Sequence, residues 1–123
     1  MKRQHIAMPV FISTLLGVAI LVQPIVIHAE PKRIQITAKR FAFEPAEITV
    51  EQGEPVVLVL KSADVAHGLR IRELHLDVKV SKGSTTETTF TPDKVGDFVG
   101  HCSVFCGSGH GKMTFTVHVV KKS

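Results

Sequence analysis

Tryptophan and tyrosine are absent from this chain of 123 residues, and cysteine occurs only twice, at Cys102 and Cys106. No basic stripe with interleaved aromatic side chains is present, so the pattern typical of nucleic-acid binding is missing. The chain has no Ser/His/Asp arrangement, no paired carboxylates and no phosphate-binding glycine loop, so nothing supports hydrolysis or phosphoryl transfer. The formal net charge of +4 is only mildly basic. These absences leave the surroundings of the two cysteines as the most informative part of the chain.

The N-terminus has the composition of an export segment. Lys2 and Arg3 give a positive start, and residues 6–27 are almost wholly apolar. Ala29 supplies the small residue expected before a cleavage site, yet the apolar stretch of about 22 residues is also long enough to cross a bilayer. We therefore predict that residues 1–29 are a signal peptide or a single membrane anchor. The remainder, residues 30–123, would then lie in the periplasm or at the outer face of the cytoplasmic membrane.

Residues 30–123 carry the pattern of short β-strands and show no amphipathic helix of ten or more residues. Apolar and polar residues alternate in several stretches, which is typical of strands with one buried face. Turn signals rich in glycine and proline separate these stretches. The expected strands lie at residues 34–38, 48–51, 56–60, 78–80, 85–91, 98–101 and 114–119. Such spacing predicts a single all-β domain, a sandwich or barrel.

The densest group of chemically distinctive residues lies between two of these strands. It contains both thiols, one imidazole and one thioether, at Cys102, Cys106, His110 and Met113. A second imidazole, His67, follows the buried strand at residues 56–60, and we expect it on another loop at the same end of the sandwich. Thiolate, thioether and imidazole are the ligands that copper accepts readily. The sequence therefore predicts a copper site.

Three interpretations of this group compete. Two histidines, one thiolate and a weak methionine complete a mononuclear blue-copper site, which leaves Cys102 surplus and allows sulfur bridging between two coppers. Zinc also accepts two cysteines and two histidines, but it would leave Met113 without a role. A disulfide between Cys102 and Cys106 is the default for an exported chain, although it would explain neither His110 nor Met113. The residues favour copper.

The spacing Cys-x3-Cys-x3-His-x2-Met, preceded upstream by Asp64-Val65-Ala66-His67, resembles the CuA domain of cytochrome c oxidase subunit II. It is also similar to the CuA domain of nitrous oxide reductase. The resemblance covers about residues 32–121 and implies a Greek-key cupredoxin with a mixed-valence centre of two copper ions. It further implies a role for each ligand. Cys102 and Cys106 would bridge the coppers, and His67 and His110 would each bind one copper. Met113 and the backbone carbonyl of Val104 would be weak ligands.

The resemblance implies electron transfer, with a c-type cytochrome as donor and an oxidase catalytic subunit as a further partner. Catalysis by this chain alone is not expected; at most it would be the electron-entry subunit of an oxidase. Three departures bear on attachment to an oxidase: Val104 stands where glutamate is usual, tryptophan is missing, and at most one membrane helix is present. A periplasmic copper-binding or copper-delivery protein is the alternative function. We expect Val104, Phe105 and Leu69 either to form a docking patch or to shield the metal.

Overall fold

The computed structural model describes residues 9–10, 17–28 and 30–123. Much of the predicted export segment at residues 1–29 lies outside this described part, so its nature as signal peptide or anchor stays a prediction. Within the described part, no helix is both long enough and apolar enough to cross a membrane.

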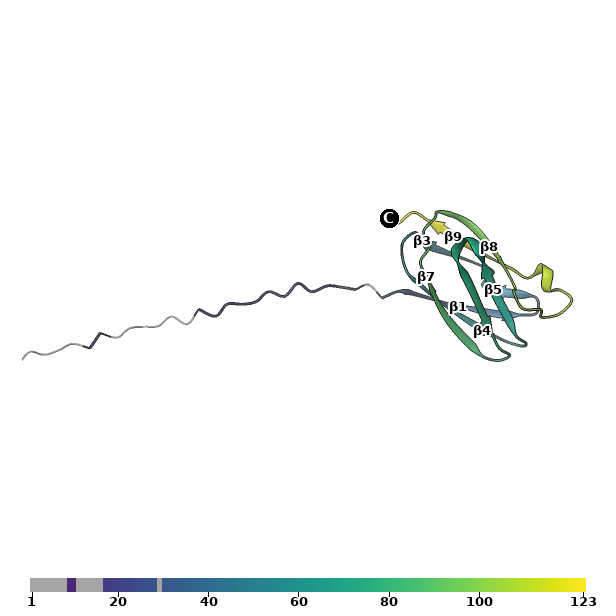
Figure 1. The fold of residues 1–123 in the computed structure, drawn as a ribbon, viewed down its shortest axis with the longest axis horizontal. Helices are drawn as coiled ribbons and strands as arrows, with labels where there is room; N and C mark the ends of the chain where they lie inside the picture. The colour runs from purple at the N-terminus through teal and green to yellow at the C-terminus, as the bar shows by residue number, and fades with distance from the viewer. Residues whose placement is uncertain (1–8, 11–16, 29) are drawn as a thin grey trace, which may run out of the picture.

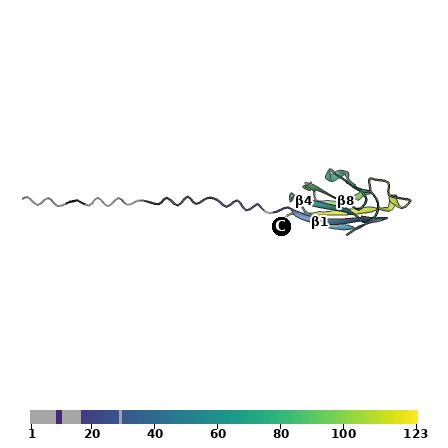
Figure 2. The ribbon, with the colours of Figure 1, turned by 90° about the horizontal axis from the view of Figure 1, so that it is seen from below.

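The folded part is a sandwich of two β-sheets, as the alternating sequence predicts (Figures 1 and 2). One sheet has the order β2-β1-β4-β7 and the other the order β3-β9-β8-β5-β6. Two short 3-10 helices interrupt the strands, η1 at Arg72–Leu74 and η2 at His110–Lys112. The strands are β1 (Lys32–Lys39), β2 (Ala42–Glu44), β3 (Glu47–Glu51), β4 (Val56–Ser62), β5 (His67–Ile71), β6 (Leu76–Val80), β7 (Thr85–Phe90), β8 (Gly96–His101) and β9 (Thr114–Val120).

The core lies between the sheets and is built from the apolar half of each alternating strand. In β9, Phe115 and Val117 are fully buried while Thr114 faces solvent. The rings of Phe43 and Phe115 meet edge to face, with centroids 5.9 Å apart, a favoured aromatic geometry. Because β4 pairs with β1 on one side and β7 on the other, it is a central strand, in agreement with its continuous apolar sequence.

Two strands do not follow from the sequence pattern. β2 has only three residues, too few to show a period, and β5 reads as buried at four of its five positions. The expectation that His67 lies on a loop is wrong, because it is the first residue of β5 and pairs with Val80 of β6. Gly68 follows it because a Cβ at that position would collide with the side chain of Ser103.

An ionic cluster crosses the outer face of the five-stranded sheet. His118 of β9 lies between two carboxylates, with Nδ1 2.6 Å from Asp97 and Nε2 3.1 Å from Glu47. The hydrogen bonds to Asp97 and Glu47 raise the pKa of His118 above its usual range. The protonated imidazole therefore stabilises the fold below the ordinary histidine pKa of about 6.5, and this stabilisation is lost as the pH rises through the raised pKa.

We expect the H118Q substitution to flatten this part of the pH profile. Between about pH 5.5 and about pH 9, a range that spans the ordinary histidine pKa, the melting temperature of the wild type should fall more than that of the variant. Only the wild type loses a favourable charge over this range. Thermal unfolding of the copper-free protein measures both profiles. H75Q is the matched control, since His75 is exposed on the turn after η1. Parallel profiles for wild type and H118Q would contradict the assignment.

Candidate metal centre

The predicted ligand loop, residues 102–113, connects β8 to β9 at one end of the sandwich. The amide of Cys102 donates to the carbonyl of Met113 at 3.1 Å, which continues the β8–β9 ladder by one step and closes the base of the loop. The amide of Ser103 donates to the carbonyl of Gly68 at 3.2 Å. These two bonds fix the start of the loop against β5, the strand that carries His67.

The turn between β1 and β2 clamps the far side of the loop. Arg40 donates from Nε to the carbonyl of Cys106 at 2.8 Å. The ring of Phe41 packs so closely on Gly107 and Gly109 that an added Cβ would lie 2.9 Å and 2.5 Å from it. Gly107 also has φ of +138°, a conformation that favours glycine. The glycines therefore serve the close approach of this turn to the ligand loop.

The sulfur atoms gather in the interior of the loop. The Sγ atoms of Cys102 and Cys106 lie 3.9 Å apart as free thiols, well beyond the disulfide bond length of about 2.05 Å. The Sδ atom of Met113 lies 3.8 Å from Cys106 Sγ, and the carbonyl oxygen of Val104 lies 3.1 Å from Cys102 Sγ. Both cysteines are 4% exposed and Met113 is fully buried. The loop thus holds three sulfurs out of water and places one carbonyl beside them.

Each cysteine has its own imidazole neighbour. The Nδ1 atom of His67 lies 3.9 Å from Cys102 Sγ, and the Nδ1 atom of His110 lies 3.7 Å from Cys106 Sγ. The ligand atoms of His67, Cys102 and Cys106 all fall within 4.8 Å of one another. His110 does not belong to this compact group of described residues. The two histidines therefore flank the sulfur pair instead of converging on one point.

Asp64 orients His67. Its Oδ1 atom lies 2.6 Å from Nε2 of His67, and its Oδ2 atom accepts from the backbone amide of Arg40 at 2.8 Å. Burial opposes ionisation of Asp64, but hydrogen bonds from the Arg40 amide, from His67 and from the Val65 amide outweigh it and lower the pKa to about 2. The carboxylate therefore accepts the proton on Nε2 and leaves Nδ1 for a metal, the arrangement by which carboxylates commonly fix metal-binding histidines.

We expect the D64N substitution to weaken copper binding about 10- to 100-fold, the usual cost of losing such a partner. The asparagine can offer its NH2 group to Nε2, which would favour the wrong tautomer. Competition with a chromophoric Cu(I) chelator measures the affinity. D93N is the matched control, because Asp93 lies on a turn at the opposite end of the sandwich. Equal affinities for D64N and D93N would show that Asp64 is not a positioning residue.

The donor set fits copper. Two thiols, two imidazoles and a thioether are the ligand types that copper accepts, and thioether is a poor ligand for zinc. Metal-bound cysteine sulfur lies about 2.3 Å from the ion, so two sulfurs 3.9 Å apart can share one ion at an ordinary ligand angle. Burial and the neighbouring Cys102 raise the pKa of the Cys106 thiol. Metal binding must therefore release that proton, and loading becomes pH-dependent.

A model of the cupredoxin-like domain matches residues 11–115. The chain belongs to the cupredoxin-like family. Cytochrome c oxidase subunit 2 of Thermus thermophilus is 32% identical over 89 residues, which cover 72% of this chain and 65% of that protein. A second subunit 2 from this species is matched over 52% of its length, so the chain spans roughly half to two thirds of these relatives. Nitrous-oxide reductase of Pseudomonas fluorescens is 31% identical over 93 residues, 72% of this chain and 15% of the reductase.

Solved structures agree on the fold. The periplasmic domain of subunit II of the Bradyrhizobium japonicum cytochrome oxidase superimposes with a TM-score of 0.67 at 21% identity, covering 74% of this chain and 85% of the domain. The blue copper protein auracyanin A of Chloroflexus aurantiacus gives 0.61 at 19% identity and covers 74% and 100%. The predicted cupredoxin fold and the resemblance to oxidase subunit II are confirmed.

The predicted ligand residues all lie around the sulfur pair, but the expected docking patch is only partly right. Leu69 is fully buried in the core and cannot dock a partner, because strand β5 turns it inward. Phe105 is 78% exposed, and Val104 is half-buried. The imidazoles of His75 and His101 are exposed and that of His118 is half-buried, and all three lie outside the compact group of His67, Cys102 and Cys106.

Proposed function

We propose that this cupredoxin is a one-electron carrier whose centre holds two copper ions in a CuA-type arrangement. The observation that carries the proposal is the buried pair of thiols, each with its own imidazole. Cys102 and Cys106 would bridge the ions, and His67 and His110 would each bind one through Nδ1. Met113 and the Val104 carbonyl would be weak ligands. Copper would supply a one-electron redox couple. The protein would supply a site whose geometry changes little between the oxidised and the reduced metal.

The surplus of ligands favours two ions over one. Metal–ligand distances of about 2.0–2.3 Å limit two ligands of one ion to about 4.6 Å apart. His67 meets this limit with both cysteines to within a few tenths of an ångström, whereas His110 stands outside that compact group. A single ion bound by His67, Cys102 and Cys106 would therefore leave His110 unused, and a single ion bound by the blue-copper set would leave Cys102 unused.

Burial argues against copper delivery as the function. A delivery protein must hand its ion to a partner by ligand exchange, which needs accessible ligands. Here the sulfurs and His67 are 4% exposed or less, and the Arg40 clamp closes one side of the loop. Such a preorganised site favours moving electrons over moving ions.

The relatives suggest where such a carrier acts. By analogy with the oxidase subunits it would accept electrons from a redox protein such as a c-type cytochrome and pass them to an oxidase catalytic subunit. It would work outside the cytoplasm, in the periplasm or at the outer face of the membrane, with residues 1–29 as signal peptide or anchor. Val104 cannot supply a side-chain ligand for a metal link to a catalytic subunit, so attachment would need other contacts.

Metal analysis of the copper-loaded protein tests the proposal. We expect a saturating ratio of two copper ions per chain and reversible one-electron oxidation and reduction. A saturating ratio of one, with a single strong blue absorption, would show a mononuclear site instead.

A further inference from the structure

The ligand-loop end of the sandwich is strongly asymmetric in charge. The amide of Ser62, at the end of β4, donates to the carbonyl of Ser84 in the β6–β7 turn, and the amide of Ala63 donates to the carbonyl of Ala38 near the end of β1. With the bonds that join Ser103 to Gly68 and Arg40 to Cys106, they bring the ends of β1 and β4, the β6–β7 turn and the start of β5 to the ligand-loop end of the sandwich. The cations carried by these segments and the loop are Lys39, Arg40, Lys61, Lys79, Lys82 and Lys112.

Two acidic residues at this end are already engaged. Glu44 pairs with Lys39 at 2.6 Å, and Asp64 holds His67 and the Arg40 amide. In the described part of the chain no carboxylate pairs with Lys61, Lys82 or Lys112, and all three are exposed. The opposite end mixes both signs, for example in the pair of Lys122 and Glu54. The metal end is therefore a positive face.

An apolar contact point stands within this positive face. Phe105 is the most exposed large apolar side chain described between residues 30 and 123. Its ring centroid lies 5.7 Å from that of His110, so a partner that covers Phe105 comes close to a proposed copper ligand. An apolar centre surrounded by charge is the usual anatomy of a protein interface, and the charges set the sign of the partner.

We propose that this end of the sandwich, which carries Phe105 on the ligand loop together with Lys61, Lys82 and Lys112, docks a redox protein with an acidic face. The proposal rests on the electron-transfer function above. The positive field raises the local concentration of an acidic partner and speeds encounter, whereas a basic c-type cytochrome is repelled. Phe105 then provides the short-range contact beside His110.

Two small oxidants of opposite charge test the sign of the face. The reduced, copper-loaded protein gives one electron to either hexacyanoferrate(III) or tris(phenanthroline)cobalt(III), and stopped-flow absorption follows each rate. As salt is added from a low starting concentration, we expect the rate of oxidation by the anionic oxidant to fall several-fold and the rate with the cationic oxidant to rise. Screening removes the attraction in the first case and the repulsion in the second.

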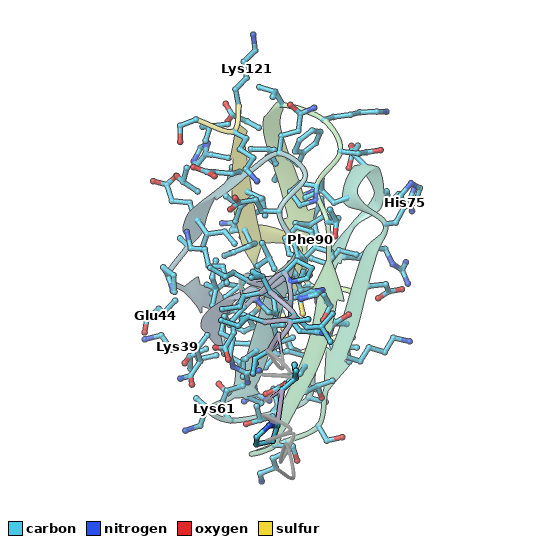
Figure 3. All side chains as sticks on the ribbon, turned by 90° about the vertical axis from the view of Figure 1, so that its left-hand side faces the viewer. Lys39, Glu44, Lys61, His75, Phe90 and Lys121 are labelled. Carbon is cyan, nitrogen blue, oxygen red and sulfur yellow. The ribbon has the colours of Figure 1, made fainter. Side chains whose placement is uncertain are left out.

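Matched charge reversals locate the face. The double variant K61E/K112E should lower the anion's rate about threefold or more at low salt, with the copper spectrum unchanged. The control K94E/K121E makes the same charge change at the far end, where Lys121 lies well away from Lys39 and Lys61 (Figure 3). Equal losses in both variants, or a rate that rises with salt for the anion, would overturn the docking face.

An acidic and a basic c-type cytochrome complete the test. We expect faster exchange with the acidic one, a decrease with salt, and a further decrease in F105A. Faster exchange with the basic cytochrome at low salt would overturn the proposal while leaving the electron-transfer function standing. Failure to exchange electrons with either small oxidant would instead overturn the function itself and this proposal with it.

Discussion

The C106S substitution is expected to abolish tight copper binding, whereas C102S should leave a one-copper protein. Cys106 Sγ lies within 3.9 Å of Cys102 Sγ, Met113 Sδ and His110 Nδ1, so its loss removes the sulfur that lies beside both His110 and Met113. Without Cys102, one thiolate, two imidazoles and a thioether remain, which is the blue-copper set. The two cysteines therefore differ in importance although they share one loop.

Copper content and the visible spectrum of each loaded variant measure this difference. We expect almost no bound copper in C106S. In C102S we expect about one copper per chain and an intense blue absorption of the kind given by a single Cu–thiolate site. S108A is the control for an exposed change in the same loop, and it should load like wild type. Equal and complete loss of copper in both cysteine variants would contradict the idea of a surplus ligand.

The F115A substitution is expected to cost about 3–5 kcal/mol of unfolding free energy, because it leaves a cavity in the centre of the core. Phe115 is fully buried, packs against Phe43, and follows Met113 by two residues. F105A is a matched control with the same chemical change. Phe105 is 78% exposed, so its removal should change the free energy by no more than about 0.5 kcal/mol.

Urea unfolding of the copper-free proteins gives both values. Copper must be absent, because a ligand that binds only the folded state adds stability of its own. A loss below about 1 kcal/mol for F115A would mean that the core collapses around the missing ring or is not packed as described. A loss for F105A similar to that for F115A would place Phe105 in the core and remove it from the proposed docking face.

The sequence predicts those strands whose two faces differ. Apolar and polar residues alternate in β3 and β9, and β4 contains a continuous apolar run, so the sequence pattern predicts the positions of all three strands. The sequence pattern does not predict β5, because both of its faces are covered at His67, Gly68 and Leu69, and Leu69 lies in the core. A pattern of period two needs one exposed face, and β5 shows one only at Arg70.

The ligands are predictable from residue type and spacing, but their supports are not. Cys102, Cys106, His110 and Met113 lie close in sequence, and a glycine-rich loop can gather them. Arg40 and Phe41 reach the loop only because β1 and β4 pair in parallel and bring the β1–β2 turn to this end. The Asp64-x-x-His67 spacing hints at a hydrogen bond, yet the backbone contact from Arg40 that holds Asp64 in place appears only in three dimensions.

Electron paramagnetic resonance of the oxidised, copper-loaded protein tests the two-copper centre most directly. If Cys102 and Cys106 bridge two ions, one unpaired electron is shared between two equivalent copper nuclei. The spectrum should then show hyperfine splitting from both nuclei and integrate to one spin for each pair of coppers. Splitting from a single copper nucleus, with one spin for every copper bound, would contradict the account.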